Sequence, residues 1–166
     1  MADLMLGGLP IELHAGAPEF NADPLEGSSV VRMSDGQGVK MTHWSGKMAG
    51  TISGAGWMPP GLDGLDYSRP LELRSTQAEC VTTNATTVVL SSVPRPDYEP
   101  WCLALVRESW VDASSAYFDG AVTIEPVPGA TRYAVYWLPI YFVYARKPRK
   151  SNAGGVHGWT LDWEEV

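Results

Sequence analysis

The sequence predicts an all-β protein, a sandwich or barrel-like arrangement of antiparallel sheets with long loops rich in glycine and proline. Glycine and proline supply 30 of the 166 residues, and this density of turn-forming residues favours many short strands over a helical bundle. The C-terminal segment alternates apolar and polar residues, as half-buried strands do. The length fits one domain, so residues 1–166 are expected to form a single β-rich domain.

The N-terminal half is predicted to form a meander that follows an extended N-terminal arm within residues 1–27. Residues 16–27 in that arm are expected to be irregular. Asp35–Gly38 predicts a hairpin turn, since glycine supplies the positive φ that such turns need. A second turn is expected at Ser45-Gly46. Strands are predicted over residues 10–15, 29–33, 39–44 and 47–53.

Residues 54–66 contain four glycines and two prolines, and they predict a shaped loop tucked against the body of the protein. The strand at 86–91 is expected to pair back onto 79–83 across Asn84-Ala85. Further strands are predicted over residues 70–75, 79–83, 86–91, 101–111, 121–125, 133–145 and 157–164.

Residues 133–145 form the longest apolar run, with aromatic residues on both faces of the predicted strand. Pro139 cannot donate to a sheet ladder, so it implies an edge or a bulge. Two interpretations stay open: one face meets another subunit, or the segment is an ordinary central strand with an exposed tyrosine rim.

The net charge of −7 disfavours partners such as nucleic acid and anionic membranes. Arg146, Lys147, Arg149 and Lys150 form a local basic run, interpreted as a solvated loop tip, a contact with an acidic neighbouring subunit or, least favoured, a nucleic-acid contact. The first 37 residues hold six acidic residues against one basic residue. Such polarised charge suits head-to-tail contact between copies.

No catalytic, cofactor or metal site is predicted. The histidines lack metal-ligand spacing, and nucleophile and phosphate-binding motifs are absent from the sequence. Cys80 and Cys102 are too few for a disulfide scaffold and are read as free thiols. The thirteen apolar residues at 133–145 fall short of the ~20 needed for a membrane helix. The start of the chain does not resemble a signal peptide, so synthesis in a cytoplasm is expected.

Two passages resemble small structural proteins from the tail and baseplate genes of long-tailed, siphovirus-type bacteriophages. One runs from Thr51 through Gly54-Ala55-Gly56-Trp57-Met58-Pro59-Pro60 to Leu73. The other combines residues 132–139 with the ending Trp159-Thr160-Leu161-Asp162-Trp163. The resemblance implies a virion subunit made in the host cytoplasm and assembled in the tail with copies of itself and other tail proteins. It also implies a ring of three or six copies near the tail tip.

The expected function is therefore structural, through subunit interfaces, with no enzymatic activity and no cofactor. The residues predicted for these interfaces are Trp57, Leu62, Leu65, Trp137, Tyr141, Tyr144, Arg146, Lys147, Arg149 and Lys150. The alternative is a sandwich module that binds a host carbohydrate or receptor through exposed aromatic residues, with Trp57, Trp159 and Trp163 as candidates. A cell-wall hydrolase is the third and least favoured function.

Overall fold

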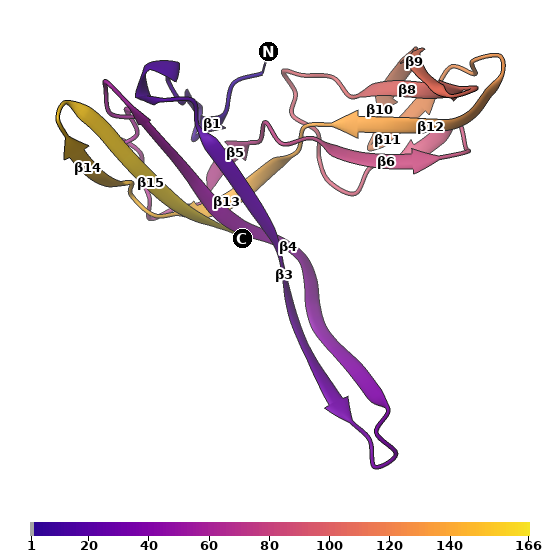
Figure 1. The fold of residues 1–166 in the computed structure, drawn as a ribbon, viewed down its shortest axis with the longest axis horizontal. Helices are drawn as coiled ribbons and strands as arrows, with labels where there is room; N and C mark the ends of the chain where they lie inside the picture. The colour runs from indigo at the N-terminus through magenta and orange to yellow at the C-terminus, as the bar shows by residue number, and fades with distance from the viewer. Residues whose placement is uncertain (1) are drawn as a thin grey trace. The chain divides into compact units, whose positions relative to one another are not determined.

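The computed structural model describes residues 2–166, and they form antiparallel β-sheets with a single 3-10 turn at Leu13–Ala15 (Figure 1). The predicted all-β class is confirmed, and the sheets do not close into a barrel. The chain divides into two compact units. Unit 1 contains the chain up to Pro10 and Glu72–Tyr141, and unit 2 contains Ile11–Leu71 and Phe142–Val166.

Unit 1 contains a sandwich of two antiparallel sheets. One sheet has the order β6-β12-β8-β9 and the other β10-β11-β7. Their bounds are β6 Glu79–Thr83, β7 Thr87–Val89, β8 Trp101–Val106, β9 Ser109–Ala113, β10 Ser115–Phe118, β11 Ala121–Ile124 and β12 Ala130–Trp137. Two short strands, β1 Met5–Leu6 and β2 Leu9–Pro10, pair with each other, and β1 also pairs with β5 Leu71–Arg74.

The core of unit 1 lies between the two sheets of the sandwich. Val88, Val122, Cys102 and Val135 are buried together there, one from each of β7, β11, β8 and β12. Trp137 is fully buried, and its indole Nε1 donates a hydrogen bond to Ser92 Oγ at 2.9 Å. Burial of these apolar faces on both sheets explains why the segments are short and apolar.

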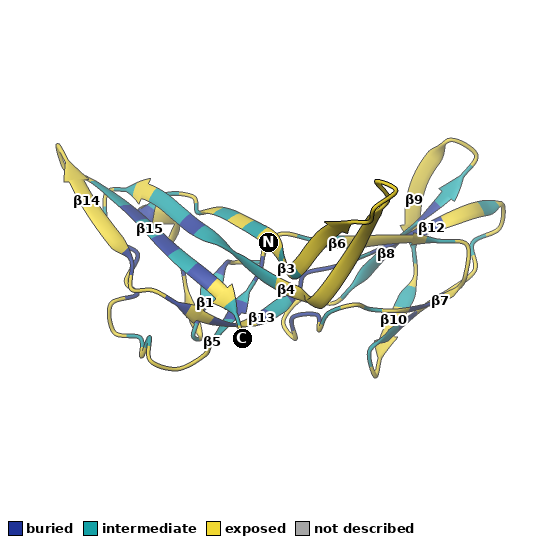
Figure 2. Cartoon of the chain, turned by 90° about the horizontal axis from the view of Figure 1, so that it is seen from below, coloured by how far each residue is buried: buried dark blue, intermediate teal, exposed yellow. Residues whose placement is uncertain are grey.

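Unit 2 is built on three long strands. These are β3 Glu19–Arg32, β4 Gly38–Gly56 and β15 Val156–Glu165. β4 pairs with β3 on one side and with β15 on the other. β15 also pairs with β14 Arg149–Ala153 and with the end of β13 Ile140–Ala145. The predicted alternation at the C-terminus is confirmed, because Trp159, Leu161 and Trp163 are all buried. Figure 2 shows the buried positions alternating with less buried ones along β15.

Two close contacts fix the inward-facing tryptophans of unit 2. The ring of Trp163 stacks on Phe20, with centroids 5.6 Å apart, and the Trp159 indole donates to the carbonyl oxygen of Ala15 at 2.9 Å. Gly50 and Gly54 leave room for the strands and rings that press on β4. A Cβ on Gly50 would lie 1.9 Å from the backbone oxygen of Asn21.

Several predicted boundaries need correction in the N-terminal half. Residues 16–27 do not form an irregular arm, because most of them belong to β3, and residues 10–15 contain the 3-10 turn instead of a strand. The turn predicted at Ser45-Gly46 is absent, since β4 runs straight through it. Gly46 does adopt a positive φ of 83°, but there it accompanies a shift in register between β3 and β4, typical of a bulge.

Three further corrections concern the second half. The predicted strand at 133–145 is broken around Pro139 into β12 and β13, and the one at 101–111 is a hairpin of β8 and β9 that turns at Arg107, with φ of 58°. β7 pairs with β11 and not with β6. In the first two cases, two shorter strands satisfy the same apolar pattern as a single long strand.

Candidate interaction surfaces

A long exposed hairpin is formed by the outer parts of β3 and β4, residues 25–48, named here the ribbon, in which residues 28–47 are all exposed. β15 pairs with β4 only from Ala49 to Gly56. The outer part of β4 therefore has β3 as its one strand neighbour (Figure 1). The predicted turn closes the ribbon: Met33 N donates to Gln37 O at 2.8 Å, and Gly36 adopts a φ of 85°.

One face of the ribbon is apolar and uncovered. Val31 lies opposite Val39, and Met41 lies opposite Ser29. Trp44 covers Gly27, where a Cβ would come within 2.2 Å of the indole nitrogen. Four exposed residues make up what is named here the apolar ribbon face: Val31 (46% exposed), Val39 (41%), Met41 (49%) and Trp44 (51%). Apolar side chains gathered on one face normally pack against another part of the chain or against another molecule.

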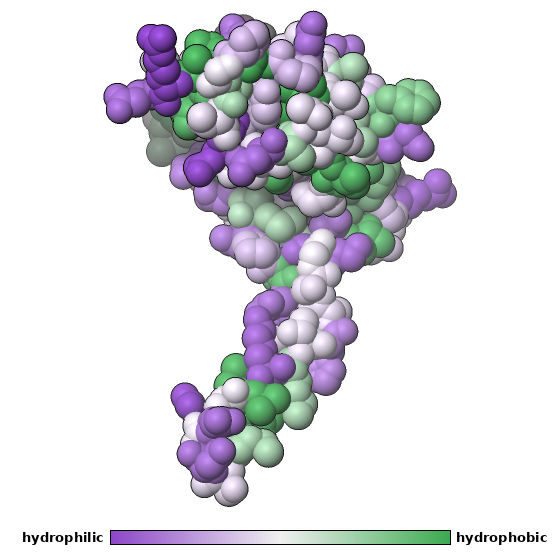
Figure 3. All heavy atoms as spheres, turned by 90° about the vertical axis from the view of Figure 1, so that its right-hand side faces the viewer, coloured by the Kyte–Doolittle hydropathy of each residue, from purple (hydrophilic) through white to green (hydrophobic). Residues whose placement is uncertain are grey.

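The opposite face of the ribbon is polar. Lys40 Nζ lies 2.6 Å from Glu26 Oε1, and Ser28 Oγ donates to the same carboxylate oxygen at 2.9 Å. The hydrogen bond from Lys40, followed by that from Ser28, lowers the pKa of Glu26. Val30 belongs to this face, because it lies opposite Lys40 in the register of the hairpin. The ribbon is therefore amphipathic, and Figure 3 shows green apolar spheres beside purple polar ones near its far end.

A shallow groove of about 600 Å³ lies where the ribbon joins the rest of unit 2. Three carboxylates, those of Asp23, Asp162 and Glu164, line it together with Arg146 and the exposed Tyr144. The groove is thus acidic on balance. Asp162 is itself held by Arg149, whose guanidinium nitrogen lies 3.2 Å from Oδ2.

The predicted basic run and the predicted Gly/Pro-rich loop contact each other inside unit 2. Lys150 forms an ion pair with Asp63, and Lys147 Nζ lies 3.9 Å from the same carboxylate. The ion pair with Lys150 lowers the pKa of Asp63. Tyr67 donates to the carbonyl oxygen of Leu62 at 2.6 Å, and burial together with the charge of Asp63 raises the pKa of Tyr67 to about 12. Two residues of the basic run, Lys147 and Lys150, thus contact Asp63 in a loop of their own chain.

The other predicted interface residues separate into buried and exposed groups. Trp137, Tyr141 and Leu62 are 0%, 6% and 1% exposed, so packing within the chain leaves them no surface to offer a partner. Leu65 is half-buried. Trp57 and Tyr144 are 68% and 52% exposed, and the four basic residues Arg146, Lys147, Arg149 and Lys150 are exposed as well.

Aromatic residues also gather on the outer face of the β6-β12-β8-β9 sheet of unit 1. The rings of Trp101 and Tyr136 are stacked with centroids 5.5 Å apart, and Tyr98 meets Trp101 edge-on at 5.6 Å. All three remain partly exposed. Of the three tryptophans named for sugar stacking from the sequence, Trp57 is exposed, whereas Trp159 and Trp163 are each 3% exposed and belong to the core of unit 2.

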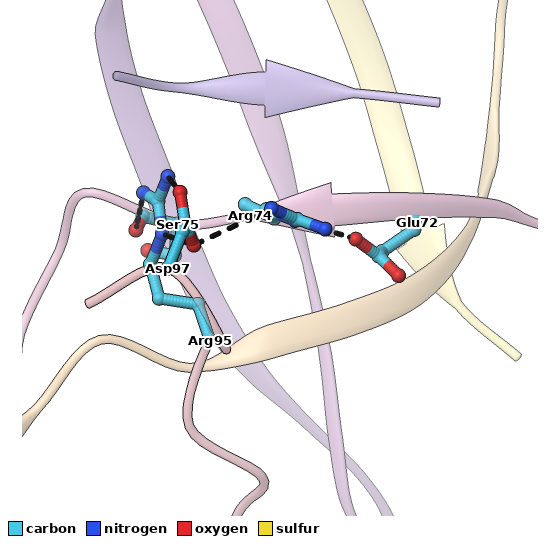
Figure 4. Close-up of polar contacts among 5 residues, drawn as sticks. All are labelled: Glu72, Arg74, Ser75, Arg95 and Asp97. Atoms are coloured by element: carbon cyan, nitrogen blue, oxygen red, sulfur yellow. Dashed lines mark hydrogen bonds and ion pairs between the residues drawn. The ribbon is translucent and has the colours of Figure 1, made fainter. Parts of the chain in front are cut away.

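A buried ion-pair network lies in unit 1 (Figure 4). The side chain of Arg95 is fully buried and donates to both carboxylate oxygens of Asp97, at 2.9 and 2.7 Å, and to the carbonyl oxygen of Ser75 at 3.0 Å. Arg74 continues the network, 3.4 Å from Asp97 and 2.6 Å from Glu72. Nε, Nη1 and Nη2 of Arg95 each donate one hydrogen bond, so this side chain connects Ser75 with Asp97.

Sequence reasoning predicted the hairpin at 29–33 and 39–44, but it missed the length of the ribbon, its candidate role as an interface and this network. The ribbon had a readable signal, because valines and methionines flank the Asp35–Gly38 turn on both sides. Arg95 had none: it stands between two prolines, and its carbonyl acceptor at Ser75 is 20 residues away.

Comparison with protein-family models, with curated proteins and with solved structures found no match. Within residues 2–166, no group of three or more histidine, cysteine or acidic side chains is arranged to hold a metal ion. The same residues form no helix with the length and apolar character required to span a membrane.

Proposed function

We propose that this protein is a structural subunit of a bacteriophage virion, located in the tail tip or baseplate, and that it acts through contacts with copies of itself and with neighbouring tail proteins. One observation carries the proposal: the apolar ribbon face is exposed on a two-stranded hairpin that no other element of unit 2 covers. The resemblance of residues 51–73, 132–139 and 159–166 to small phage tail proteins supplies the setting.

The physical argument concerns the stability of the ribbon. An isolated two-stranded hairpin is marginally stable in water, because it buries too little apolar area to offset the cost of ordering its backbone. Trp44 and Met41 expose about half of their side chains here. Burying such area contributes roughly 25 cal/mol per Å². A partner that covers the face would therefore stabilise the ribbon and the assembly together.

Particle assembly tests the proposal with a matched pair of variants. Val31→Thr with Met41→Thr makes the apolar ribbon face polar, while threonine keeps the preference for strands. Val30→Thr makes the same kind of change on the polar face of the same strand, at a valine that is 63% exposed. The double variant is expected to be lost from purified particles and Val30→Thr to be retained. Equal incorporation of both would contradict the proposal.

A second candidate function rests on the aromatic cluster of unit 1. Stacked, partly exposed rings such as Trp101 and Tyr136 offer the flat apolar surface on which a sugar ring packs. In this reading the protein is a module that binds host-cell carbohydrate. Tryptophan fluorescence titrated with cell-wall polysaccharide is expected to change in the wild type and not in Trp101→Ala, with Trp57→Ala as the control. An unchanged signal in the wild type would remove this candidate.

A further inference from the structure

The ribbon has two unpaired edges as well as an apolar face. β3 is the last strand of its sheet, so its outer edge has no neighbour among the described strands. The outer part of β4, from Gly38 to Met48, also lacks a second neighbour there, because β15 begins pairing at Ala49. Unpaired strand edges carry rows of backbone donors and acceptors that can pair with another strand. The ribbon can thus accept a strand on either side.

The two edges carry opposite charge. β3 contains three acidic residues, Glu19, Asp23 and Glu26, against the single basic residue Arg32. β4 contains Lys40 and Lys47 and no acidic residue. Glu26 and Lys40 neutralise each other within the chain. Of the other charged residues, Glu19 and Asp23 precede the ribbon on β3, Arg32 lies beside its turn, and Lys47 lies at its base on β4.

The register of the hairpin places these charges at nearly the same height. Lys47 lies opposite Leu25. Asp23 is on the same face of β3, two residues before Leu25 and toward the base of the ribbon. If a second copy stood alongside with its ribbon pointing the same way, its β3 would lie antiparallel to β4 of the first. Lys47 of one copy would then come within reach of Asp23 of the next.

We propose that copies of this chain align their ribbons side by side, with the outer edge of β4 from one copy paired to the outer edge of β3 from the next. This inference rests on the proposed function and names the partner of the ribbon as a second copy. The pairing joins unlike surfaces, so it is heterologous and generates a closed ring when the rotation between copies is right. The apolar ribbon faces then form one continuous apolar surface of the joint sheet.

The pairing stretch avoids an obstacle in β3. Pro24 cannot donate a hydrogen bond to a neighbouring strand. Residues 25–32, which lie between Pro24 and the turn, contain no proline, and neither do residues 38–48 of β4. Added strands of this kind gain affinity mainly from main-chain hydrogen bonds, while side chains at the edge select the partner. Lys47, at the end of this stretch, and Asp23, which lies just before Pro24, fit that selecting role.

The experiment uses two charge-reversal variants of the full chain, Lys47→Glu and Asp23→Lys. In each variant alone, like charges face each other across the joint. Self-association measured by analytical ultracentrifugation is therefore expected to weaken at least tenfold, about 1.4 kcal/mol. In an equimolar mixture every joint between unlike variants brings opposite charges together, so the mixture is expected to associate more strongly than either variant alone. Rescue by mixing cannot arise within one chain. Arg69→Glu, an equal charge change outside the ribbon, is expected to associate as the wild type does.

The wild type itself is expected to sediment as a multiple of 18.0 kDa. A wild type that stays monomeric at high concentration, or a mixture that associates no more strongly than either variant alone, would overturn the proposal. If the wild type is monomeric while Val31→Thr with Met41→Thr still fails to enter particles, the ribbon binds a different tail protein. The proposed function would then stand without the pairing between copies.

Discussion

Arg95 holds Asp97 by two parallel hydrogen bonds, although the guanidinium is fully buried and the carboxylate is 39% exposed. The same guanidinium donates to the carbonyl oxygen of Ser75, and the amide of Arg95 donates to that of Leu138 at 2.8 Å. One side chain and its backbone therefore connect three segments of unit 1 beside the break between β12 and β13.

Replacing Arg95 with alanine is expected to lower the free energy of unfolding by about 3–5 kcal/mol, because it leaves the carbonyl oxygen of Ser75 without this donor and removes two hydrogen bonds from Asp97. Chemical denaturation followed by tryptophan fluorescence measures the loss. Arg69→Ala removes an ion pair whose arginine side chain is 82% exposed, and it should cost less than about 1 kcal/mol. Equal losses in the two variants would show that Arg95 is not a structural centre.

Acid should weaken this network in a defined range. The hydrogen bonds from Arg95 lower the pKa of Asp97 from 3.8 to about 2. Because the folded value lies below the unfolded one, the stabilisation is complete above about pH 4 and is lost as the pH falls toward 2. Screening at the partly exposed carboxylate limits the effect to about 1 kcal/mol. Denaturation curves between pH 5 and 2 are expected to show this loss in the wild type, and Asp97→Asn should lack it.

Gly50 should tolerate no side chain. A Cβ there would lie 1.9 Å from the backbone oxygen of Asn21, so Gly50→Ala must push β3 away from β4. The loss in unfolding free energy is expected to exceed about 2 kcal/mol. Gly64, where an added Cβ meets nothing within 4 Å, provides the control. A Gly50→Ala variant as stable as Gly64→Ala would mean that β3 and β4 are not paired in this register.

Asp63 anchors the Gly/Pro-rich loop through Lys150 and Lys147. Asp63→Asn removes the charge and is expected to leave global stability within about 1 kcal/mol, since all three groups are largely exposed. The loop at residues 57–66 should become easier to cleave, and limited proteolysis with mass spectrometry locates the cut. Asp35→Asn, an exposed change in the ribbon turn, serves as the control. Unchanged cleavage at the loop would indicate that the ion pairs do not restrain it.

The sequence predicted the fold class because glycine, proline and alternating residues are local signals of turns and strands. The C-terminal strand was correct since Trp159, Leu161 and Trp163 repeat every second residue. The break at Pro139 was anticipated only as a bulge. Which strands pair depends on contacts between residues far apart in the sequence. The pairing of β7 with β11 could therefore not be derived from the local pattern.

The candidate surface was partly readable. Trp57 and the basic run were placed on the surface by residue type alone, but Trp137 and Leu62 are buried although they looked suited to an interface. An apolar residue fits a core and an interface equally well, and only the fold decides which it meets. The hairpin at 29–33 and 39–44 was predicted, but the full length of the ribbon was not, because Gly46 was interpreted as a turn that divides β4 into two short strands.

Amide hydrogen exchange of the ribbon tests the central claim most directly. We expect residues 25–32 and 38–48 to exchange rapidly in dilute protein and to become protected in assembled particles, while the turn at Ser34–Gly36 continues to exchange. The contradicting result is protection only around Tyr98, Trp101 and Tyr136 of unit 1, with the ribbon exchanging equally fast in dilute protein and in particles. It would mean that the ribbon is not the assembly interface.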